Sequence, residues 1–476
     1  FYAVNPLSVV YVSGEAHLDV IQVFLMTAGM WGVAAGRERT GFFLLGAAVM
    51  SKILAVVVLP FFINAGNWKK ALFALVPVAV VIPFADAGLQ LFDSLLVFGT
   101  RMHFNDGITS LIRPVFAGLT PLLSALLLSA ALATIWLVEP VPIRSAFLAV
   151  AALLMLLPTL HPWYLLMVLP FLAVYPSPAW IYLSAGVALT FPALGHEFQT
   201  GVFQERHWIK WIEYLPFFGF LIYGAFRGKR EGEPFLYGAV STLSVVIPTL
   251  NESRRIDRCL DSLAGQEGIQ EIIVVDGGSH DDTLRKARLR GLTVLESTPG
   301  RGRQIRMGTE TAASDLILVL HGDSRLRSGT ARRLIDHLNR RPEVPGGAFG
   351  MVFEPVSFGT RAVSLLNAFR ARFLGISFGD QGQYVRTEVL DRMGGFPELD
   401  LMEDVELSLK LKSFGRPGYL PGGIVVSDRR WQDGGFAGKV GIVVWLCLRY
   451  LAERRWRGAP GKTTDYYDVY YRRHLK

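Results

Sequence analysis

The stretch Asp315-Leu316-Ile317-Leu318-Val319-Leu320-His321-Gly322-Asp323 decides the fold of the second half of the chain. Its five consecutive apolar residues are typical of a strand that is buried on both faces of a parallel sheet covered by helices. Such a strand ends at the carboxyl edge of the sheet, where open α/β sheets bind their ligands. Asp323 is therefore a candidate ligand-binding carboxylate, and the alternative is that it caps the next helix.

Strand and helix patterns alternate around this stretch. Apolar runs that end in polar residues predict further strands at 243–249, 271–276 and 292–295. Ser279 and Asp282 form a capping-box pattern for a helix after the second of these strands. The alternation predicts an α/β domain with a doubly wound, mostly parallel sheet over residues 242–476.

The first half of the 476-residue chain differs in kind, because apolar runs dominate it. It predicts a polytopic α-helical membrane domain over residues 1–228 and a linker over 229–241. The apolar stretches of spanning or near-spanning length are 18–35, 41–63, 71–93, 115–138, 145–158, 162–175, 178–195 and 210–226. No signal-peptide pattern precedes them, and we expect the natural start of this domain to lie before Phe1.

The net charge of +8 suits an anionic partner, and the basic residues flank the apolar stretches. Since basic loops face the cytoplasm, this pattern predicts an integral protein of the inner (cytoplasmic) membrane with its second half on the cytoplasmic side. All of the basic loops can face the cytoplasm only if the stretch 41–63 enters the membrane and returns on the same side, as a broken or re-entrant pair, rather than crossing once. No motif for nucleic-acid binding is present, so the bilayer is the predicted partner. Cys259 and Cys447 have no ligand or disulfide spacing and are interpreted as core residues.

Polar groups gather in the loops that this topology places outside. They are Glu15, His17, Asp19, His103, Asn105, Asp106, His161 and the segment 196–207. Such a cluster is a candidate site, and the alternative is ordinary loop solvation with aromatic anchoring. Together with Asn5-Pro6, Lys52 before Leu59-Pro60, His161-Pro162-Trp163-Tyr164 and Leu169-Pro170, the pattern resembles polyprenyl-phosphate-sugar-dependent glycosyltransferases of the GT-C class. That class places an essential acidic residue in an earlier outward loop that this sequence does not contain.

Acidic residues follow the predicted strands of the second half. Glu252, Asp276 and Asp323 would lie along one edge, where carboxylates can accept hydrogen bonds from a ribose or a base and can hold Mg²⁺ or Mn²⁺ with substrate phosphates. Arg301 and Arg303 could neutralise the phosphates. Each residue has an ordinary alternative as a cap, a turn former or a solvated charge.

The motifs Pro248-Thr249-Leu250-Asn251-Glu252, Val274-Val275-Asp276-Gly277-Gly278-Ser279 and His321-Gly322-Asp323 together resemble family 2 glycosyltransferases of the GT-A fold. The resemblance covers about residues 243–435, and Gly379-Asp380-Gln381-Gly382 and Glu403-Asp404 place it closest to selenodomain-associated transferases. It implies a nucleotide-sugar donor bound around Thr249, Glu252, Asp276 and Gly277, with Asp276 on the nucleoside. It also implies inversion at the anomeric carbon and a divalent metal on Asp323. The usual metal motif has an aspartate where this chain has His321.

Glu403 and Asp404 are adjacent acids at the start of a predicted helix. A glycosyl transfer requires a base for the attacking hydroxyl, and a carboxylate can serve. Asp404 is the better candidate and Glu403 its supporter; the alternative is charge that complements the helix dipole. Asp380 and Gln381 are predicted on the acceptor side, as are Arg430 and Trp431, which resemble the Arg-Trp motif of processive relatives.

An apolar segment near 436–452 is too short to span with confidence. It would lie on the membrane surface and bring the site to a lipid acceptor, or it is a core helix. The sequence therefore predicts an inverting, metal-dependent glycosyltransferase that moves a sugar from a nucleotide-sugar donor to a membrane lipid or polyprenyl-phosphate acceptor. The alternative is a transporter or flippase with a nucleotide-sugar-binding regulatory domain.

Overall fold

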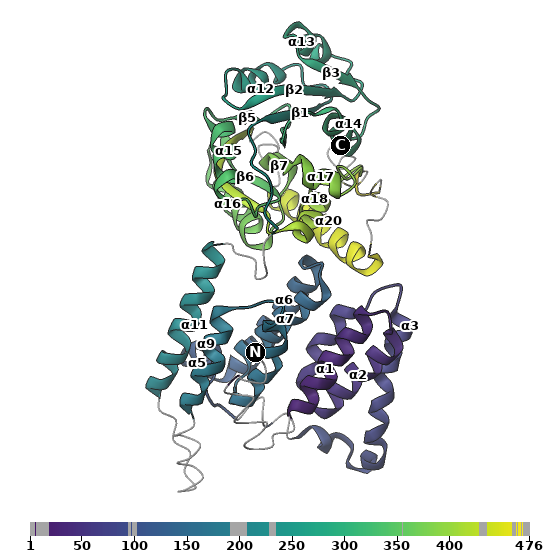
Figure 1. Cartoon of the computed structure of the whole chain (residues 1–476), viewed down its shortest axis with the longest axis vertical. Coiled ribbons are helices and arrows are strands. Elements are labelled where there is room, and N and C mark those ends of the chain that lie inside the picture. The colour runs from purple at the N-terminus through teal and green to yellow at the C-terminus, as the bar shows by residue number, and fades with distance from the viewer. Residues whose placement is uncertain are drawn as a thin grey trace. The chain divides into compact units, whose positions relative to one another are not determined.

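The computed structural model describes residues 19–93, 102–190, 207–227, 235–354, 356–427 and 436–458, together with residues 5, 97, 463, 465–467 and 469 (Figure 1). The chain divides into two compact units. The first comprises residues 1–232 and 455–458, and the second comprises residues 233–454 and 459–476. Each unit is described by itself.

The regular elements in the described part of the first unit are helices, and several of them are short or of the 3-10 type. In chain order they are α1 (Asp19–Ala34), α2 (Glu38–Ser51), η3 (Ile53–Phe62), α3 (Trp68–Ala71), η4 (Leu72–Phe92), α5 (Thr109–Phe116), η5 (Ala117–Leu119), α6 (Thr120–Val138), α7 (Pro142–Leu156), η6 (Pro162–Met167), α8 (Leu169–Leu172), α9 (Pro178–Gly186), η7 (Val187–Thr190) and α11 (His207–Arg227).

Two helical stretches in the described part of the chain are long and apolar enough to cross a membrane, Trp68–Gly88 and Thr109–Val138. The sequence predicts eight stretches of spanning or near-spanning length, and the described residues contain two such helices. A polytopic domain therefore stays a prediction. Proline is one physical reason. Pro142, Pro162 and Pro178 each begin a new helix and thereby divide the apolar sequence into shorter segments.

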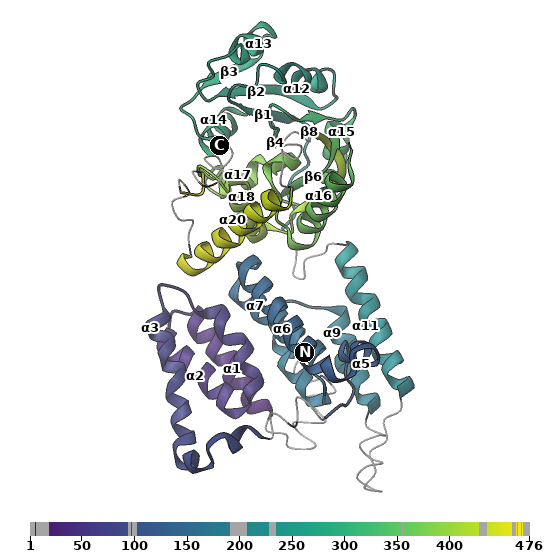
Figure 2. The same ribbon diagram turned by 180° about the vertical axis from the view of Figure 1, so that it is seen from behind.

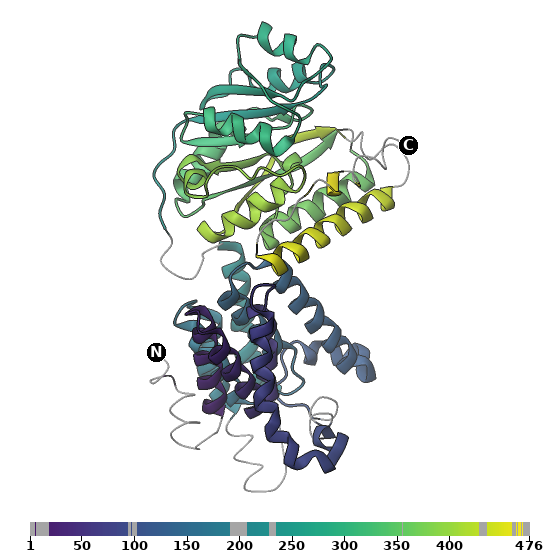
Figure 3. The same cartoon turned by 90° about the vertical axis from the view of Figure 1, so that its right-hand side faces the viewer.

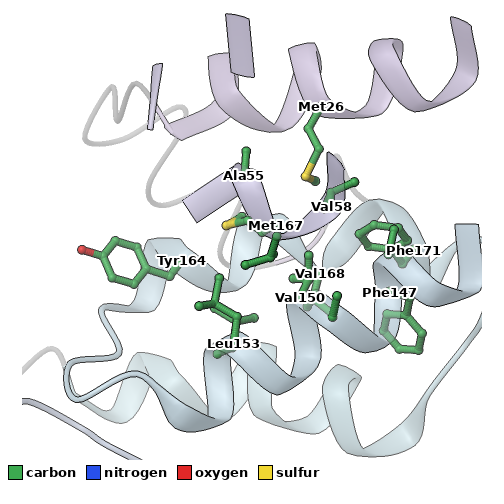
Figure 4. Packing of buried hydrophobic residues seen from close by; sticks show 14 of the residues in the cluster. Met26, Ala55, Val58, Phe147, Val150, Leu153, Tyr164, Met167, Val168 and Phe171 are labelled. Atoms are coloured by element: carbon green, nitrogen blue, oxygen red, sulfur yellow. The ribbon is translucent and has the colours of Figure 1, made fainter. Parts of the chain in front are cut away.

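The apolar stretch 41–63 is broken, as predicted, at Lys52, whose extended backbone separates α2 from η3. Buried side chains of α1, η3, α7 and η6 form one core, in which Met26 and Val58 lie near Val150 and Met167 (Figure 4). The pair α1 and α2 packs closely, because a Cβ on Gly41 would lie 2.5 Å from the backbone nitrogen of Val33.

The second unit contains an eight-stranded mixed sheet of order β3-β2-β1-β4-β7-β6-β8-β5 (Figure 2). Its strands are β1 (Leu243–Thr249), β2 (Ile269–Asp276), β3 (Thr293–Glu296), β4 (Leu316–Val319), β5 (Arg325–Leu326), β6 (Gly346–Glu354), β7 (Gln383–Arg386) and β8 (Gly418–Ser427). The first four are parallel, as predicted. Strand β7 is antiparallel to both β4 and β6, so the predicted parallel pattern does not extend through the whole sheet.

Helices cover both faces of the sheet because successive strand residues point to opposite faces. Val245 and Ile247 pack with α12 (Ile256–Leu263) and α15 (Thr330–Arg340), whereas Val246 packs with the helices of the other face. The other helices of the unit are α13 (Thr283–Leu289), α14 (Arg301–Thr311), α16 (Phe358–Phe369), η8 (Arg370–Leu374), η9 (Gly379–Gln381), α17 (Thr387–Arg392), α18 (Glu403–Phe414) and α20 (Phe436–Arg457). Figure 3 shows the two layers of helices from the side.

The predicted capping box of Ser279 and Asp282 was wrong. Asp282 precedes α13 without a side-chain capping bond, and Asp281 accepts the backbone N–H of Thr283 at 3.0 Å instead. Ser279 donates to Asp276, so it takes no part in a capping box. The alternative role of Asp323 as a helix cap is excluded, since α15 begins at Thr330.

Candidate active site at the carboxyl edge of the sheet

The ends of β1 and β2 lie side by side, with Thr249 in register with Asp276. The Asp276 carboxylate accepts hydrogen bonds from Thr249 Oγ1 (3.2 Å), Gly278 N (3.0 Å), Ser279 N (2.7 Å) and Ser279 Oγ (2.6 Å). Four bonds match the acceptor capacity of a carboxylate. Asp276 therefore shapes the loop after β2 in this conformation, and its predicted contact with a nucleoside remains a prediction.

Gly277, also predicted to bind the donor, lies where the loop after β2 meets α14. A Cβ there would come within 3.0 Å of the Gln304 side chain. Gln304 Nε2 donates to the carbonyls of Thr249 (2.8 Å) and Val275 (2.9 Å). Sequence reasoning missed Gln304; its signal was a glutamine on the buried face of a helix.

The turn that holds Asp323 packs against the end of β1. A Cβ on Gly322 would lie 3.2 Å from Thr249 Cγ2 and 3.6 Å from the Glu252 side chain. Glu252 accepts a hydrogen bond from Arg255 at 3.0 Å. Burial raises the pKa of the Cys259 thiol, and the nearby charges of Asp323 and Glu252 raise it further. The structure thus brings Thr249, Glu252 and Asp323 together.

Asp323 suits the predicted metal. It is half-buried, and the one hydrogen bond that its carboxylate accepts from the described residues is from Ser324 Oγ at 3.4 Å. The described residues contain no group of three His, Cys, Asp or Glu side chains that could hold a metal ion. Mg²⁺ commonly binds through one or two carboxylates with substrate phosphates. This donor set therefore fits a metal that arrives with the donor.

Asp404 is the second residue of α18 and is held by backbone groups. Its Oδ2 accepts the N–H of Gly379 at 2.7 Å, and its Oδ1 accepts the N–H of Val405 at 2.7 Å. Gln383 Nε2, from β7, donates to the Asp404 carbonyl at 2.9 Å. Met402, just before the pair of acids, has a left-handed backbone with φ 69°. This conformation costs energy for a residue with a Cβ and is concentrated at functional sites.

Glu403, the first residue of α18, is fully buried and forms an ion pair with Arg301 of α14. Its second oxygen, Oε2, has no hydrogen-bond partner within the described part of the chain. Burial raises the pKa of Glu403 to about 7; Arg301 opposes this rise and Asp404 adds to it. A carboxyl group with a pKa near the operating pH is suited to acid–base work.

Gly379 lies between the turn that holds Asp323 and the Glu403-Asp404 pair. An ideal Cβ on Gly379 would lie 2.7 Å from His321 Nε2 and 3.5 Å from Asp404 Oδ2. The ring of His321, which stands where the usual metal motif has an aspartate, therefore packs against the glycine whose N–H holds Asp404. The Asp323 turn and the Glu403-Asp404 pair thus border one site.

The structure describes two of the four residues that were predicted on the acceptor side. Asp380 and Gln381 belong to η9, and Gln381 accepts a hydrogen bond from Arg370 Nη2 at 2.9 Å. Burial lowers the pKa of Arg370, and the charges of Asp380 and Asp404 oppose this shift. Sequence reasoning missed Arg370, whose signal was an arginine inside an apolar run. Arg430 and Trp431 lie outside the described residues.

Arg303 does not point into this site. It donates to Glu398 at 3.0 Å and to Thr298 at 2.6 Å, and its side chain is 48 % exposed. Residues two apart on a helix do not share a face, so Arg301 and Arg303 diverge. The placement favours Arg301 alone beside the acidic pair.

The first unit contains ionic contacts among the residues predicted to gather in outward loops. Buried Asp106 pairs with Arg113 and, at 2.7 Å, with Lys210. Asp19 pairs with Lys52, whose ammonium lies 4.0 Å from the centre of the Tyr164 ring. Glu15, His17 and residues 196–206 lie outside the described part. The pairs of Asp106 with Lys210 and of Asp19 with Lys52 connect segments distant in sequence, and an outward site stays a prediction.

Glu403→Gln tests the raised pKa. If turnover needs an ionised Glu403, the rate falls as the pH drops below about 7. In the variant, this decrease on the acidic side of the pH–rate profile, its acid limb, is expected to disappear or to move to lower pH. Initial rates from pH 5 to 9 on wild type and variant measure the shift. Glu398→Gln, at a carboxylate whose side chain is 44 % exposed, is the control. An unchanged limb near pH 7 in Glu403→Gln would assign it to another group.

Residues 244–393 match the family model of glycosyl transferase family 2, and residues 1–66 match that of the N-terminal domain of alpha-(1->6)-mannopyranosyltransferases. Curated relatives match shorter parts of the chain. A 4,4'-diaponeurosporenoate glycosyltransferase of Staphylococcus haemolyticus is 30 % identical over 141 residues, which is 27 % of this chain and 36 % of the relative. A glucosyl-3-phosphoglycerate synthase of Mycobacterium tuberculosis is 31 % identical over 107 residues, which is 20 % of this chain and 33 % of the relative.

An uncharacterised protein of Mycobacterium tuberculosis is 40 % identical over 119 residues, 24 % of this chain and 35 % of that protein. The chain thus spans about a third of the length of the curated relatives it matches. Among solved structures, a mannosyltransferase from Pyrobaculum calidifontis with GDP-Man and Mn²⁺ is 19 % identical, with 57 % of this chain and 76 % of that chain covered and a TM-score of 0.37. The chain carries a glycosyltransferase family 2 domain after a segment similar to a mannosyltransferase N-terminal domain.

Proposed function

From the family 2 glycosyltransferase domain over residues 244–393, we propose that the chain transfers a sugar from a nucleotide-sugar donor to a membrane lipid or polyprenyl-phosphate acceptor, with inversion at the anomeric carbon. The observation that carries the proposal is the contact through Gly379. It connects the Asp323 turn, suited to a donor diphosphate, with Asp404, suited to a base. Nothing in the named relatives supports the alternative of a transporter or flippase.

In the proposed reaction with a lipid that bears a hydroxyl, Asp404 takes the proton of this hydroxyl while the hydroxyl oxygen forms the new glycosidic bond. A polyprenyl phosphate would instead attack through a phosphate oxygen that is already ionised. The nucleoside diphosphate leaves from the opposite face of the anomeric carbon. Two backbone N–H bonds fix the Asp404 carboxylate, so little reorientation is needed during proton transfer. Glu403, in its ion pair with Arg301, sets the local charge. Mg²⁺ or Mn²⁺, held by Asp323, would neutralise charge on the departing diphosphate.

The donor site would be formed by Thr249, Glu252 and the loop of Asp276 and Gly277. Their shared edge, together with the names of the relatives as a glycosyltransferase and a glucosyl-3-phosphoglycerate synthase, supports a hexosyl donor. The succession of motifs at 379–382 and 403–404 further supports the selenodomain-associated subfamily. We assign Asp380 and Gln381 to the acceptor side because η9 adjoins Asp404.

A lipid acceptor is supported by the two helices long and apolar enough to span a membrane and by the 4,4'-diaponeurosporenoate in the name of one relative. We place the protein in the cytoplasmic membrane with the family 2 domain on the cytoplasmic side, where nucleotide sugars are made. The mannosyltransferase-like segment at residues 1–66 belongs to a separate domain, with 229–241 as its linker to the family 2 domain.

The test is release of nucleoside diphosphate from a panel of UDP- and GDP-sugars by the full chain in membrane vesicles, with and without lipid extract. Turnover of one donor that depends on the extract, with the label recovered in a lipid fraction, would support the proposal. Donor binding without turnover, with extract and Mn²⁺ supplied, would contradict it.

A further inference from the structure

The described part of α16 and η8 turns a stripe of large apolar side chains to the outside. Leu365, Leu366, Phe369 and Phe373 are 72 %, 62 %, 57 % and 49 % exposed. Residues spaced in this way share one side of a helix. The opposite side of the same helices is buried and includes Val363 and Ala371. Contiguous exposed apolar residues of this size mark a surface that binds another apolar partner.

The charged residues of α16 and η8 are all basic. Residues 357–374 contain three arginines and no acidic residue. Arg361 and Arg372 are exposed, and the Arg372 guanidinium lies 5.8 Å from the centre of the Phe373 ring. Arginines beside exposed leucine and phenylalanine suit an anionic lipid surface, where the charged head meets phosphate and the apolar body enters the acyl boundary.

α20 provides a second set of such residues. Val444, Trp445 and Leu448 are 50 %, 51 % and 46 % exposed, and the Arg449 guanidinium lies 5.6 Å from the centre of the Trp445 ring. A cavity of about 440 Å³ beside them is lined by Gly438, Gly441, Ile442, Trp445 and Val469. Tryptophan is enriched at membrane interfaces.

The two helices belong to the same end of the second unit. Burial raises the pKa of the Cys447 thiol in α20 to about 11, and the charge of Arg370 in η8 opposes this rise, so the two elements are neighbours. Figures 1 and 2 show α16 and α20 together, away from α13 at the opposite end. We define the apolar face by seven residues: Leu365, Leu366, Phe369, Phe373, Val444, Trp445 and Leu448.

We propose that this apolar face lies in the headgroup region of a bilayer that contains anionic lipid. The inference deepens the proposed function, because it states how a lipid acceptor reaches the site. Arg370, at the end of the stripe, donates to Gln381 beside Asp380. The elements that would enter the lipid surface are thus one hydrogen bond from the acceptor side. A bilayer is favoured over a protein partner by the arginines without acids and by the spanning-length helices of the same chain.

The test replaces Phe369 by the photoreactive p-benzoylphenylalanine in the full chain, reconstituted in nanodiscs of phosphatidylglycerol and phosphatidylethanolamine. Illumination is expected to attach lipid to the protein at this position. Leu289 on α13, 76 % exposed, is the matched control and is expected to attach none. Crosslinks from position 369 to residues 19–227 would show that the first unit covers the face. No crosslink, or equal labelling at 289, would equally overturn the inference.

A second measurement keeps the inference testable if the labelled chain folds poorly. Leu366→Glu with Phe369→Glu is expected to reduce transfer to a bilayer-embedded acceptor about tenfold or more, because two charges oppose insertion. Leu289→Glu is expected to leave transfer unchanged, and an equal loss in both variants would contradict the inference. Lipid crosslinking requires no turnover, so its failure is distinguishable from failure of the proposed transferase.

Discussion

Asp404→Asn is expected to lower kcat by about 10³-fold, since a positioned general base contributes roughly 10²–10⁴-fold. The asparagine has nearly the same shape but cannot take a proton from an acceptor hydroxyl. Its amide can accept only one of the two backbone N–H groups, from Gly379 and Val405, that now bond to the carboxylate. The unsatisfied group costs about 1–3 kcal/mol of folding free energy, which thermal unfolding can measure.

The control for this variant is Asp261→Asn, at a carboxylate whose side chain is 64 % exposed and pairs with Arg290. It changes the same chemical group far from the site and is expected to keep wild-type kcat. Donor affinity, measured by nucleotide-sugar titration, should be retained in Asp404→Asn. Turnover within about tenfold of wild type would remove Asp404 from the role of base.

Asp323→Ala is expected to abolish metal-dependent turnover, a loss of about 10²–10³-fold, because charge on the leaving diphosphate would no longer be neutralised at this position. Chelation of wild type should give a similar loss that Mn²⁺ or Mg²⁺ reverses. The variant should not respond to either treatment. The measurement is initial rate against metal concentration for both proteins.

Ser324→Ala is the control for the metal prediction. It removes the hydroxyl that donates to Asp323 at 3.4 Å and leaves the carboxylate in place. We expect it to retain activity and metal response. If chelator leaves wild-type turnover unchanged, or if Asp323→Ala still responds to Mn²⁺ as wild type does, Asp323 does not hold a catalytic metal.

The parallel half of the sheet could be predicted from the sequence because local pattern determines it. The apolar runs at 243–249 and 316–320 are long and end in polar groups, and the structure has strands there. The direction of β7 could not be predicted in this way. Its pairing with β4 joins residues far apart in sequence, such as Leu316 and Arg386, and depends on packing rather than on local preference.

The candidate site likewise has parts that could be predicted from local sequence and parts that could not. The order of acidic residues after the strands indicated Glu252, Asp323 and the pair at 403–404, which the structure places around one edge. The local bonding of Asp276 could not be foreseen, because it depends on how the loop after β2 folds back. Hydropathy alone also does not register where proline divides an apolar run into shorter helices, as at Pro142, Pro162 and Pro178.

The position of β7 between β4 and β6 has a consequence for the timing of assembly. During synthesis the donor edge, complete at β4, emerges well before Gln383 and Gly379, the residues that hold Asp404. A nascent chain can therefore fold the proposed donor site before the residues that hold Asp404 have been made. The sheet is complete only after β7 and then β8 have been made, so a nascent chain that ends before Asp404 lacks the proposed base.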